Sequence, residues 1–394
     1  MTVMCLSDLG QVITGNTPSK SIEDFYDSED ICFVKPSDFY SNSLSIIDKT
    51  ENYLSEKAKC FSRIVPKESI LVTCIGIIGK VAVLNRDAAF NQQINAIIPN
   101  KKKVLPLYLA YSLLSKQQEL TWQANAAVVP IINKSQFSKL NLDIHDIYSQ
   151  NKIVSVLSKV DTLTTEVKKQ LEDFDLLIKS RFIEMFGDPV KNTLGWPIKT
   201  LGDISSLITN GNTPKGGSQN YVADGILFLR SQNVWRNRID LEDVAYITKE
   251  IHDSLKKSSL HNRDILITKT GRVNTENSSL GRAALFVGED NSANINGHVY
   301  LVRLKNGVIP EFVLSILVGE EYRRYIRKVC VGGIDKRQIN LDQVEDFPII
   351  LPPVQMQQRF VDFVAQVDKS KLAVQQSLNE LETLKKSLMQ QYFG

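Results

Sequence analysis

The clearest hydrophobic pattern in the chain is a three-four spacing of apolar residues in two long stretches, one in mid-chain and one at the end. Sustained over several heptads, this spacing predicts amphipathic helices that share a coiled-coil seam. Lys371 and Lys385 interrupt the seam of the second stretch. The seam positions are Ile153, Leu157, Val160, Val167, Leu171, Phe174, Ile178, Phe182, Phe360, Val364, Val367, Val374, Leu378, Leu381 and Leu388.

Before each long stretch the pattern is different. Short runs rich in β-branched residues, bounded by Gly, Asn and Asp, predict strands. They lie at 70–73, 81–84, 94–98, 226–229, 265–268 and 299–304. Segments 106–114 and 310–318 start with proline and have helical periodicity, which predicts two short helices. The sequence therefore predicts two mixed α and β domains, each followed by a long helix.

The two halves also repeat each other in sequence. Gly-Asn-Thr-Pro occurs at 15–18 and 211–214, and the long stretches end in Phe-Gly at 186–187 and 393–394. The long stretches align without a gap, whereas the domains need insertions. Within the domains we align the strand 70–73 with 265–268, Gly79-Lys80 with Gly281-Arg282, Asn91 with Asn294, and 132–134 with 334–336.

Connectivity then predicts the architecture. The second domain begins where the first helix ends, so the second helix buries its seam only by running back antiparallel. About 37 residues of helix span about 55 Å, so the expectation is an α+β protein whose two domains are held about that far apart by a coiled-coil spacer, with a pseudo-two-fold repeat. The predicted boundaries are 1–148 and 188–353 for the domains, and 149–187 and 354–394 for the helices.

Composition and charge narrow the function. The formal net charge is only +3, so any nucleic-acid binding depends on local basic clusters. The five cysteines form no CxxC pair and the histidines are isolated, so no metal site is expected. There is no phosphate-binding loop, nucleophile elbow or apolar run of membrane-spanning length. We expect a cytoplasmic protein that catalyses no reaction alone.

Basic and amide-bearing loops are the candidate chemistry. Residues 230–238 hold three arginines, several amides and a tryptophan without an acid, and Arg, Asn and Gln make bidentate contacts to base edges. A solvated loop with a half-buried Trp is the alternative. The short basic segment 322–328 is either a phosphate-tracking face or a solvated one. The candidate DNA-contacting residues are Lys35, Ser37, Lys80, Asn91, Gln92, Lys134, Arg230, Gln232, Asn233, Trp235, Arg236, Lys269, Arg272, Arg282, Lys336 and Arg337.

Two different domains that alternate with two matching long helices, together with the repeated Gly-Asn-Thr-Pro, the Leu-Pro-Pro at 351–353 and the closing Phe-Gly pairs, resemble the specificity subunit of Type I restriction–modification enzymes. The resemblance covers the whole chain. It implies two target recognition domains that each read one half of a bipartite sequence in double-stranded DNA, and helices that fix the spacer.

The resemblance also implies the partners and the absence of cofactors on this chain. Two modification subunits carry S-adenosylmethionine and methylate adenine N6, and restriction subunits with ATP and Mg²⁺ translocate and cleave DNA. No membrane contact is implied. Two alternatives stay open at this point. One is the recognition subunit of another bipartite-site restriction system, and the other is a coiled-coil scaffold whose domains bind protein.

Overall fold

The computed structural model describes residues 1–40, 43–124, 130–272, 275, 277–333 and 336–394. The chain divides into two compact units, one formed by 1–169 with 375–394 and the other by 170–374. Each unit therefore combines one mixed α and β domain with parts of both long helices. None of the helices in the described ranges is long and apolar enough to cross a membrane.

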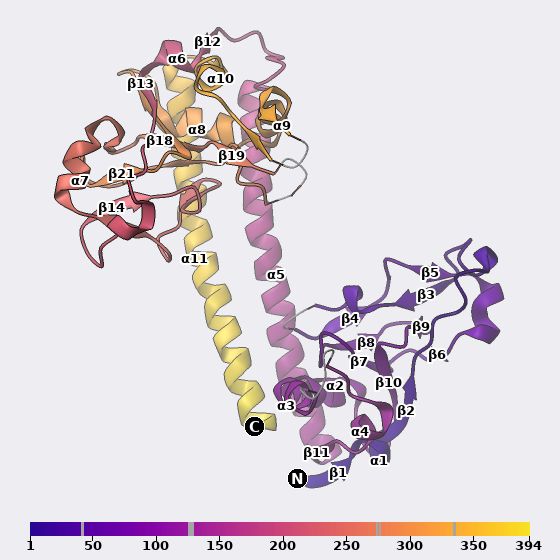
Figure 1. Cartoon of the computed structure of the whole chain (residues 1–394). Helices are drawn as coiled ribbons and strands as arrows, with labels where there is room; N and C mark the ends of the chain where they lie inside the picture. The colour runs from indigo at the N-terminus through magenta and orange to yellow at the C-terminus, as the bar shows by residue number, and fades with distance from the viewer. Residues whose placement is uncertain (41–42, 125–129, 273–274, 276, 334–335) are drawn as a thin grey trace. The chain divides into compact units, whose positions relative to one another are not determined.

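The long helices are α5 (Ile147–Phe186) and α11 (Val354–Phe393), each of 40 residues and drawn as unbroken rods in Figure 1. Helix α5 starts two residues before the predicted 149. Asp146 explains the difference, because its carboxylate accepts hydrogen bonds from the backbone N–H (3.0 Å) and the hydroxyl (2.7 Å) of Ser149. In α5 an aspartate caps the N–H groups of the first turn, whereas α11 is preceded by two prolines.

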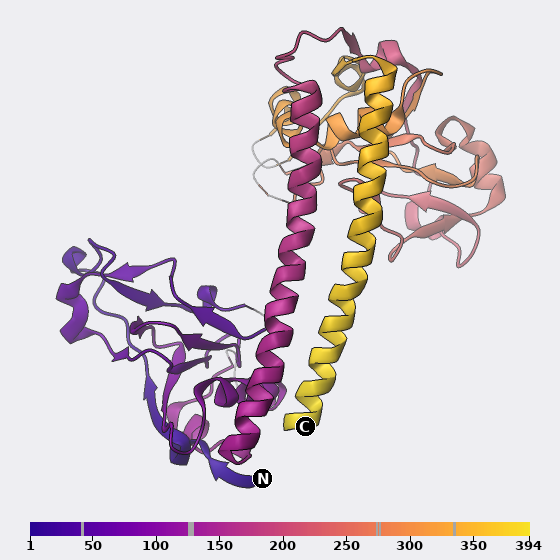
Figure 2. The same ribbon diagram turned by 180° about the vertical axis from the view of Figure 1, so that it is seen from behind.

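The two helices contact each other inside each unit. In unit 1 the start of α5 lies beside the end of α11, and in unit 2 the end of α5 lies beside the start of α11, as Figures 1 and 2 show from opposite sides. All the predicted seam positions are buried or half-buried. The two seam lysines meet acids of α5, since Lys385 pairs with Asp161 in unit 1 and Lys371 with Asp175 in unit 2.

The domain of unit 1 is built on two larger sheets and one small one. The five-stranded sheet has the order β2 (Gly10–Thr14), β10 (Ile94–Pro99), β7 (Ile70–Thr73), β8 (Val81–Leu84), β4 (Ser45–Ile47). The four-stranded sheet has the order β5 (Tyr53–Leu54), β3 (Ile31–Val34), β9 (Ala88–Phe90), β6 (Ile64–Val65), and β1 (Thr2–Cys5) pairs with β11 (Asn141–Ile144). The short helices are α1 (Leu6–Leu9), α2 (Pro106–Ser115), α3 (Gln117–Gln123) and α4 (Lys134–Ser138).

The domain of unit 2 repeats this plan. Its sheets have the orders β13 (Ser205–Asn210), β22 (Val299–Leu304), β18 (Ile265–Thr268), β20 (Ala283–Leu285); β17 (Ala245–Ile247), β14 (Ile226–Leu229), β21 (Ala293–Ile295); and β12 (Ile198–Thr200) with β25 (Pro348–Ile350). Two small additions are the hairpin β15 (Val234–Trp235) with β16 (Arg238–Ile239), and the sheet β19 (Thr270–Gly271), β24 (Arg337–Gln338), β23 (Val331–Gly332). The helices are α6 (Leu201–Ile204), α7 (Lys249–Ser254), α8 (Pro310–Val318), α9 (Glu320–Val329) and α10 (Leu341–Glu345).

All six predicted strands and both proline-started helices are confirmed within a residue at each end. The shared plan is also confirmed, because β3 pairs parallel with β9 as β14 does with β21, while the other equivalent pairs are antiparallel. This order of strands fixes which residues of the two domains are equivalent.

The predicted alignment was wrong at two places. Asn91 corresponds to Asn296 and not to Asn294, since each accepts a hydrogen bond from the N–H two residues later (3.1 Å in both domains). Asn133 corresponds to Asn340, because each stands in a capping box at the start of α4 or α10. Lys134 is therefore not the counterpart of Lys336. Residues 334–335 of that alignment lie outside the described residues.

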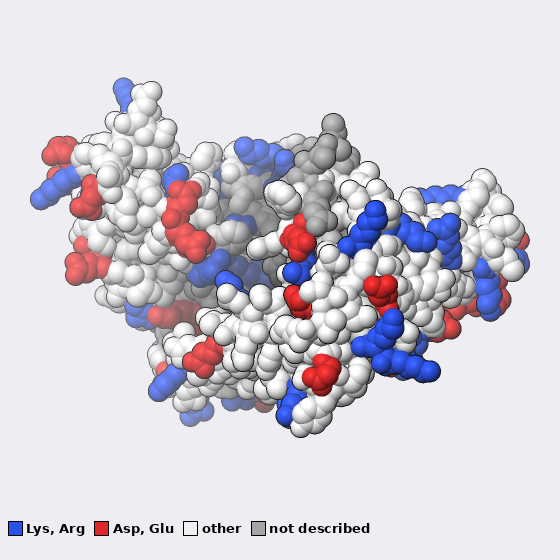
Figure 3. Space-filling model, turned by 90° about the horizontal axis from the view of Figure 1, so that it is seen from below, with Lys and Arg blue, Asp and Glu red and all other residues white. Residues whose placement is uncertain are grey.

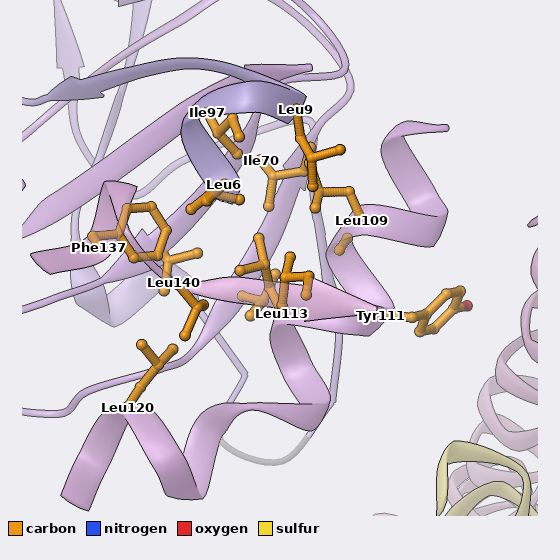
Figure 4. Packing of buried hydrophobic residues seen from close by; sticks show 14 of the residues in the cluster. Leu6, Leu9, Ile70, Ile97, Leu109, Tyr111, Leu113, Leu120, Phe137 and Leu140 are labelled. Carbon is orange, nitrogen blue, oxygen red and sulfur yellow. The ribbon is translucent and has the colours of Figure 1, made fainter. Parts of the chain in front are cut away.

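A continuous apolar core joins each domain to the helices of its unit. Figure 4 shows the core of unit 1, in which α1, α2 and α4 direct leucines and Phe137 between them and the large sheet. Tyr111 points away from the other labelled side chains, and its hydroxyl donates to Asp161 of α5 (2.8 Å). In unit 2 four phenylalanines, from both long helices and α8, pack ring against ring; they are Phe182, Phe186, Phe312 and Phe360.

Candidate nucleic-acid interface

The additions to the domain of unit 2 form an open groove of about 690 Å³. One wall is the hairpin β15–β16 with the residues before it, and the other is β19 with the loop that follows it. The groove brings together five of the predicted site residues and several small polar ones. Its described lining is Ser231, Gln232, Trp235, Thr270, Gly271, Arg272, Thr275, Asn277, Ser278, Ser279, Arg282 and Lys336.

Trp235 and Arg282 form the centre of the groove. Trp235 pairs with Arg238 across the two-residue turn of the hairpin, and the turn is fixed because the N–H of Asn237 donates to Ala283 O (2.8 Å). The guanidinium carbon of Arg282 lies 4.0 Å from the centroid of the Trp235 ring, and that of Arg238 lies at 5.5 Å. Cations stacked on an indole ring lose side-chain freedom and gain electrostatic attraction.

Backbone carbonyls hold the Arg282 side chain from its other side. Nε donates to Ser278 O (3.1 Å) and Nη2 to Asn277 O. Burial, and after it the nearby charge of Arg323, lowers the pKa of Arg282 from its ordinary value. Arginine nevertheless stays protonated at physiological pH, so the groove contains a charged and partly desolvated guanidinium.

Helix α9 adds positive charge behind the groove. Glu320 is the shared anion of Arg236 (2.7 Å) and Arg323 (3.6 Å). Burial opposes ionisation of Glu320, but these arginines hold its pKa below the ordinary value. One carboxylate thus faces two guanidiniums, and Arg327 adds a further positive charge near Arg323. Segment 322–328 lies in helix α9, and the Arg323 side chain is largely buried and belongs to this cluster.

Residues at the start of the loop 230–238 shape it and contact little solvent. The Arg230 side chain is 20% exposed and pairs with Asp243 (3.0 Å), and its Nε is buried without a partner in the described structure. Asn233 is 2% exposed, and its amide donates to Asp240 O (2.9 Å) and Asp243 O (2.8 Å). Both were predicted to contact DNA, but their hydrogen bonds place them in the framework that supports the groove. Gln232 is exposed at its edge.

The remaining candidates of unit 2 lie around the groove. Arg272 and Lys336 are exposed and line it directly. Lys269 is half-buried, with its ammonium 5.7 Å from the Tyr300 ring centroid. Arg337 in β24 pairs across to Gly271 of β19 and donates from Nε to Gly333 O (3.4 Å). Arg272 and Lys336 therefore add positive charge to the groove itself, whereas Lys269 and Arg337 are not among its lining residues.

The candidates of unit 1 do not form an equivalent cluster. Lys80 is 8% exposed and its ammonium donates to Phe39 O (3.1 Å), and Asn91 is 7% exposed and forms an Asx turn with Gln93. Both are thus interior residues, where the sequence predicted DNA contacts. Lys35 donates to Asn52 (2.6 Å). The exposed candidates are Ser37, Gln92 and Lys134.

Sequence reasoning missed the acids and small polar residues that complete the groove. Asp243 follows the loop 230–238 by five residues and folds back to pair with Arg230, whereas Glu320 is distant in sequence and only the fold brings it to Arg236. The run Asn277-Ser278-Ser279 supplies carbonyls and hydroxyls to the groove, and its small polar composition was the available signal. Within the described part of the chain, no group of three or more His, Cys, Asp and Glu side chains is placed to hold a metal ion.

Basic side chains gather locally and do not cover a whole face. On the face shown in Figure 3, Lys and Arg alternate with Asp and Glu. This distribution agrees with the net charge of +3. The groove is therefore distinguished by the partly buried guanidinium of Arg282, and not by a broad positive field.

Comparison with known proteins identifies the family. The family model described as Type I restriction modification DNA specificity domain matches residues 1–173 and 194–383. The MjaIX specificity subunit of Methanocaldococcus jannaschii is 25% identical over 410 residues, which cover 98% of this chain and 90% of that protein. The HindI specificity subunit of Haemophilus influenzae is 36% identical over 181 residues, or 44% of this chain and 39% of that protein.

A solved structure supports the fold. The crystal structure of the S subunit of a type I restriction–modification system from M. genitalium matches with a TM-score of 0.58 at 15% identity, covering 100% of this chain and 96% of that one. The likeness is one of fold, since the identity is low. Together with the family match over most of both halves, it shows that the chain belongs to the Type I restriction modification DNA specificity domain family, with two copies of that domain in tandem.

Proposed function

We propose that this chain is the DNA sequence-recognition subunit of a Type I restriction–modification complex. The observation that carries the proposal is the groove of unit 2, where Arg282, Arg272, Gln232 and Lys336 converge beside Trp235 in a domain of this family. Arginine and amide side chains are the groups that make bidentate contacts to base edges, and flanking cations contact phosphates.

The duplicated domain supports a bipartite target. Two domains with the same strand order but different exposed side chains present different surfaces to DNA, so each reads one half of the sequence. The long helices set the distance between the halves. Each of these helices has 40 residues, about 60 Å at 1.5 Å per residue.

The exposed sides of the long helices support docking of partner subunits. Apolar side chains outside the seam remain 46–63% exposed, which is unusual for positions on a regular amphipathic helix. They are Leu163, Leu176, Leu177, Ile183, Leu372 and Leu384. We propose that modification subunits cover them. The chain itself is non-catalytic, and S-adenosylmethionine, ATP and Mg²⁺ act on the modification and restriction subunits.

Methylation mapping tests the proposal. The chain is co-expressed with the modification subunit of its own system in a host that lacks other adenine methylases, and N6-methyladenine is mapped across the genome. We expect one motif of two short half-sites separated by a fixed number of unspecified bases. Methylation of a contiguous motif would refute the bipartite assignment, and methylation without sequence preference would refute the recognition role.

An insertion separates the spacer from the readers. Four residues, roughly one helical turn, are added to α5 and α11 at facing positions. The expected motif keeps both half-sites and changes only in the number of unspecified bases between them. A changed half-site would show that the helices take part in base recognition.

A further inference from the structure

Arg282 is held more rigidly than any other groove cation that the described residues include. Its guanidinium stacks on Trp235, and its Nε and Nη2 donate to the carbonyls of Ser278 and Asn277. The two hydrogen bonds and the ring contact together restrict movement of the guanidinium. A side chain positioned in this way meets a ligand in one orientation, without the ordering entropy that a free arginine loses.

The contacts leave one edge of the guanidinium available. Nε has one N–H and each Nη has two, and the two carbonyls accept one N–H from Nε and one from Nη2. No hydrogen bond to another described residue engages Nη1. The edge formed by Nη1 and Nη2 therefore presents two parallel N–H donors, which is the fork that matches two adjacent acceptors.

The electrostatic state of Arg282 favours an acceptor in the groove. Burial and the charge of Arg323 both disfavour its protonated form, as the lowered pKa indicates. Glu320, a carboxylate of this cluster, is already shared by Arg236 and Arg323. Burial removes hydrogen bonds between the Arg282 guanidinium and water. A ligand that presents two acceptor atoms and no donor to Nη1 and Nη2 would replace those hydrogen bonds.

We propose that Arg282 is a specificity-determining residue and that it selects guanine, whose O6 and N7 are adjacent acceptors in the major groove of DNA. Adenine presents one acceptor and one donor there, and cytosine presents a donor, so neither satisfies two N–H groups. Trp235 is a positioning residue for Arg282. The proposal rests on the proposed function, since it names the base that this groove takes.

The equivalent position in unit 1 explains why the effect concerns one half-site. Thr73 and Thr268 end equivalent strands, and their hydroxyls accept from the backbone N–H of Lys80 (3.0 Å) and Arg282 (2.9 Å) respectively. The Lys80 side chain turns inward and donates to Phe39 O. Unit 1 therefore has no exposed cation at this position, and guanine selection by this device belongs to the domain of unit 2.

Methylation mapping of variants in the intact complex tests the proposal. We expect the wild-type motif to contain a guanine in one half-site, and Arg282→Gln to relax that position alone. Loss of one bidentate pair, worth about 1–3 kcal/mol, corresponds to about a 5- to 150-fold loss of discrimination against the other bases. Trp235→Leu should relax the same position to a smaller extent.

The controls separate recognition from folding and from phosphate binding. Arg263→Gln removes an arginine from an exposed pair with Glu311, outside the groove, and should leave the motif unchanged. Arg282→Lys keeps the charge and also loses the fork, so it should relax the same base. Thermal unfolding and co-purification with the modification subunit establish that each variant is folded. If Arg282→Gln does not fold, the motif of Arg282→Lys decides the test.

Three outcomes would overturn the proposal. An unchanged motif in both Arg282 variants would show that another residue reads the base. A uniform loss of methylation at all sites, without a change at any base, would identify Arg282 as a phosphate contact. Relaxation at an A·T pair, and not at a G·C pair on either strand, would show that the ligand is a different base. A wild type without a bipartite motif would instead refute the proposed function, which keeps the two failures distinct.

Discussion

The pair formed by Asp161 and Lys385 gives a sharp test of how the end of α11 is held in unit 1. The Lys385 ammonium contacts one carboxylate oxygen of Asp161, and the Tyr111 hydroxyl donates to the other (2.8 Å). The two charged side chains are 28% and 16% exposed. Burial, and then the charge of Asp161, raises the pKa of Tyr111, which therefore stays a protonated donor.

The expected magnitude lies between those of exposed and buried pairs. Removal of one partner costs about 0.2–1 kcal/mol for an exposed pair and about 3–5 kcal/mol for a buried one. Removal of one partner from a partly exposed pair with an additional hydrogen bond should therefore destabilise the folded protein by about 1–3 kcal/mol. Asp161→Asn and Lys385→Met should each show this loss, and the double variant should lose less than the sum because neither charge is then left alone.

Hydrogen exchange in the full-length chain measures this loss locally. Opening of residues 375–393 is followed by mass spectrometry under conditions where protection reports an opening free energy, which avoids the assumption of two-state unfolding for a protein of two units. The single variants should reduce protection in that segment by about 5- to 150-fold, at about 1.4 kcal/mol for each factor of ten.

A matched control uses the same helices in the same unit. Lys168 and Glu382 form an ion pair of 3.1 Å whose side chains are 55% and 54% exposed, so Glu382→Gln should change protection by less than about fivefold. Equal effects of Glu382→Gln and Asp161→Asn would refute the reasoning from burial. If the loss of opening free energy in the double variant equalled the sum of the two single losses, Asp161 and Lys385 would not interact.

Three further changes test the framework of unit 2. Phe360→Ala should destabilise the unit by about 3–5 kcal/mol in urea unfolding, because the ring is fully buried among three other phenylalanines; a loss below about 1 kcal/mol would contradict that packing. Arg303→Met leaves Asp264, 2% exposed, without its cation; it should lower the thermal midpoint clearly, and Asp264→Asn in the same chain should restore part of the loss. Gly211→Ala should cost about 1–3 kcal/mol, since its Cβ would lie 1.9 Å from Ile295 O, and an unchanged midpoint would mean that this contact relaxes freely.

The long helices could be predicted from the sequence because their signal is local and periodic. The seam residues recur at three-four spacing, and all of them are buried or half-buried. Lys371 and Lys385 looked like flaws in that pattern. Their partners Asp175 and Asp161 lie on the other helix. Only the antiparallel pairing of the helices shows that each lysine charge is neutralised by an aspartate.

The candidate site was only partly predictable, because side-chain roles depend on residues distant in sequence. Three residues of the loop 230–238 line a polar groove, which the sequence did not predict; they are Ser231, Gln232 and Trp235. Arg230 and Asn233 nevertheless bind Asp243, and nothing in the sequence of the loop shows that this acid folds back to them. The hairpin at Trp235 and the small sheet at Gly271 were missed, since two-residue strands carry no periodic signal.

The predicted alignment of Gly79-Lys80 with Gly281-Arg282 is confirmed by backbone hydrogen bonds, whereas it was wrong at Asn91 and Asn133. The same glycine turn joins β7 to β8 and β18 to β20: Gly79 and Gly281 have positive φ (80° and 65°), and each N–H donates to the threonine carbonyl at the end of the strand before it (2.9 and 3.0 Å). A side chain at these glycines would be strained. The backbone at this position is therefore constrained in both domains.

What differs is the side chain that follows the turn. The Lys80 ammonium donates to the carbonyl of Phe39 in the interior of its domain. The Arg282 guanidinium instead donates to the carbonyls of Ser278 and Asn277 and stacks on Trp235. A fixed backbone turn that is followed by Lys80 in one domain and Arg282 in the other therefore gives two copies of one fold different side-chain chemistry at the same position.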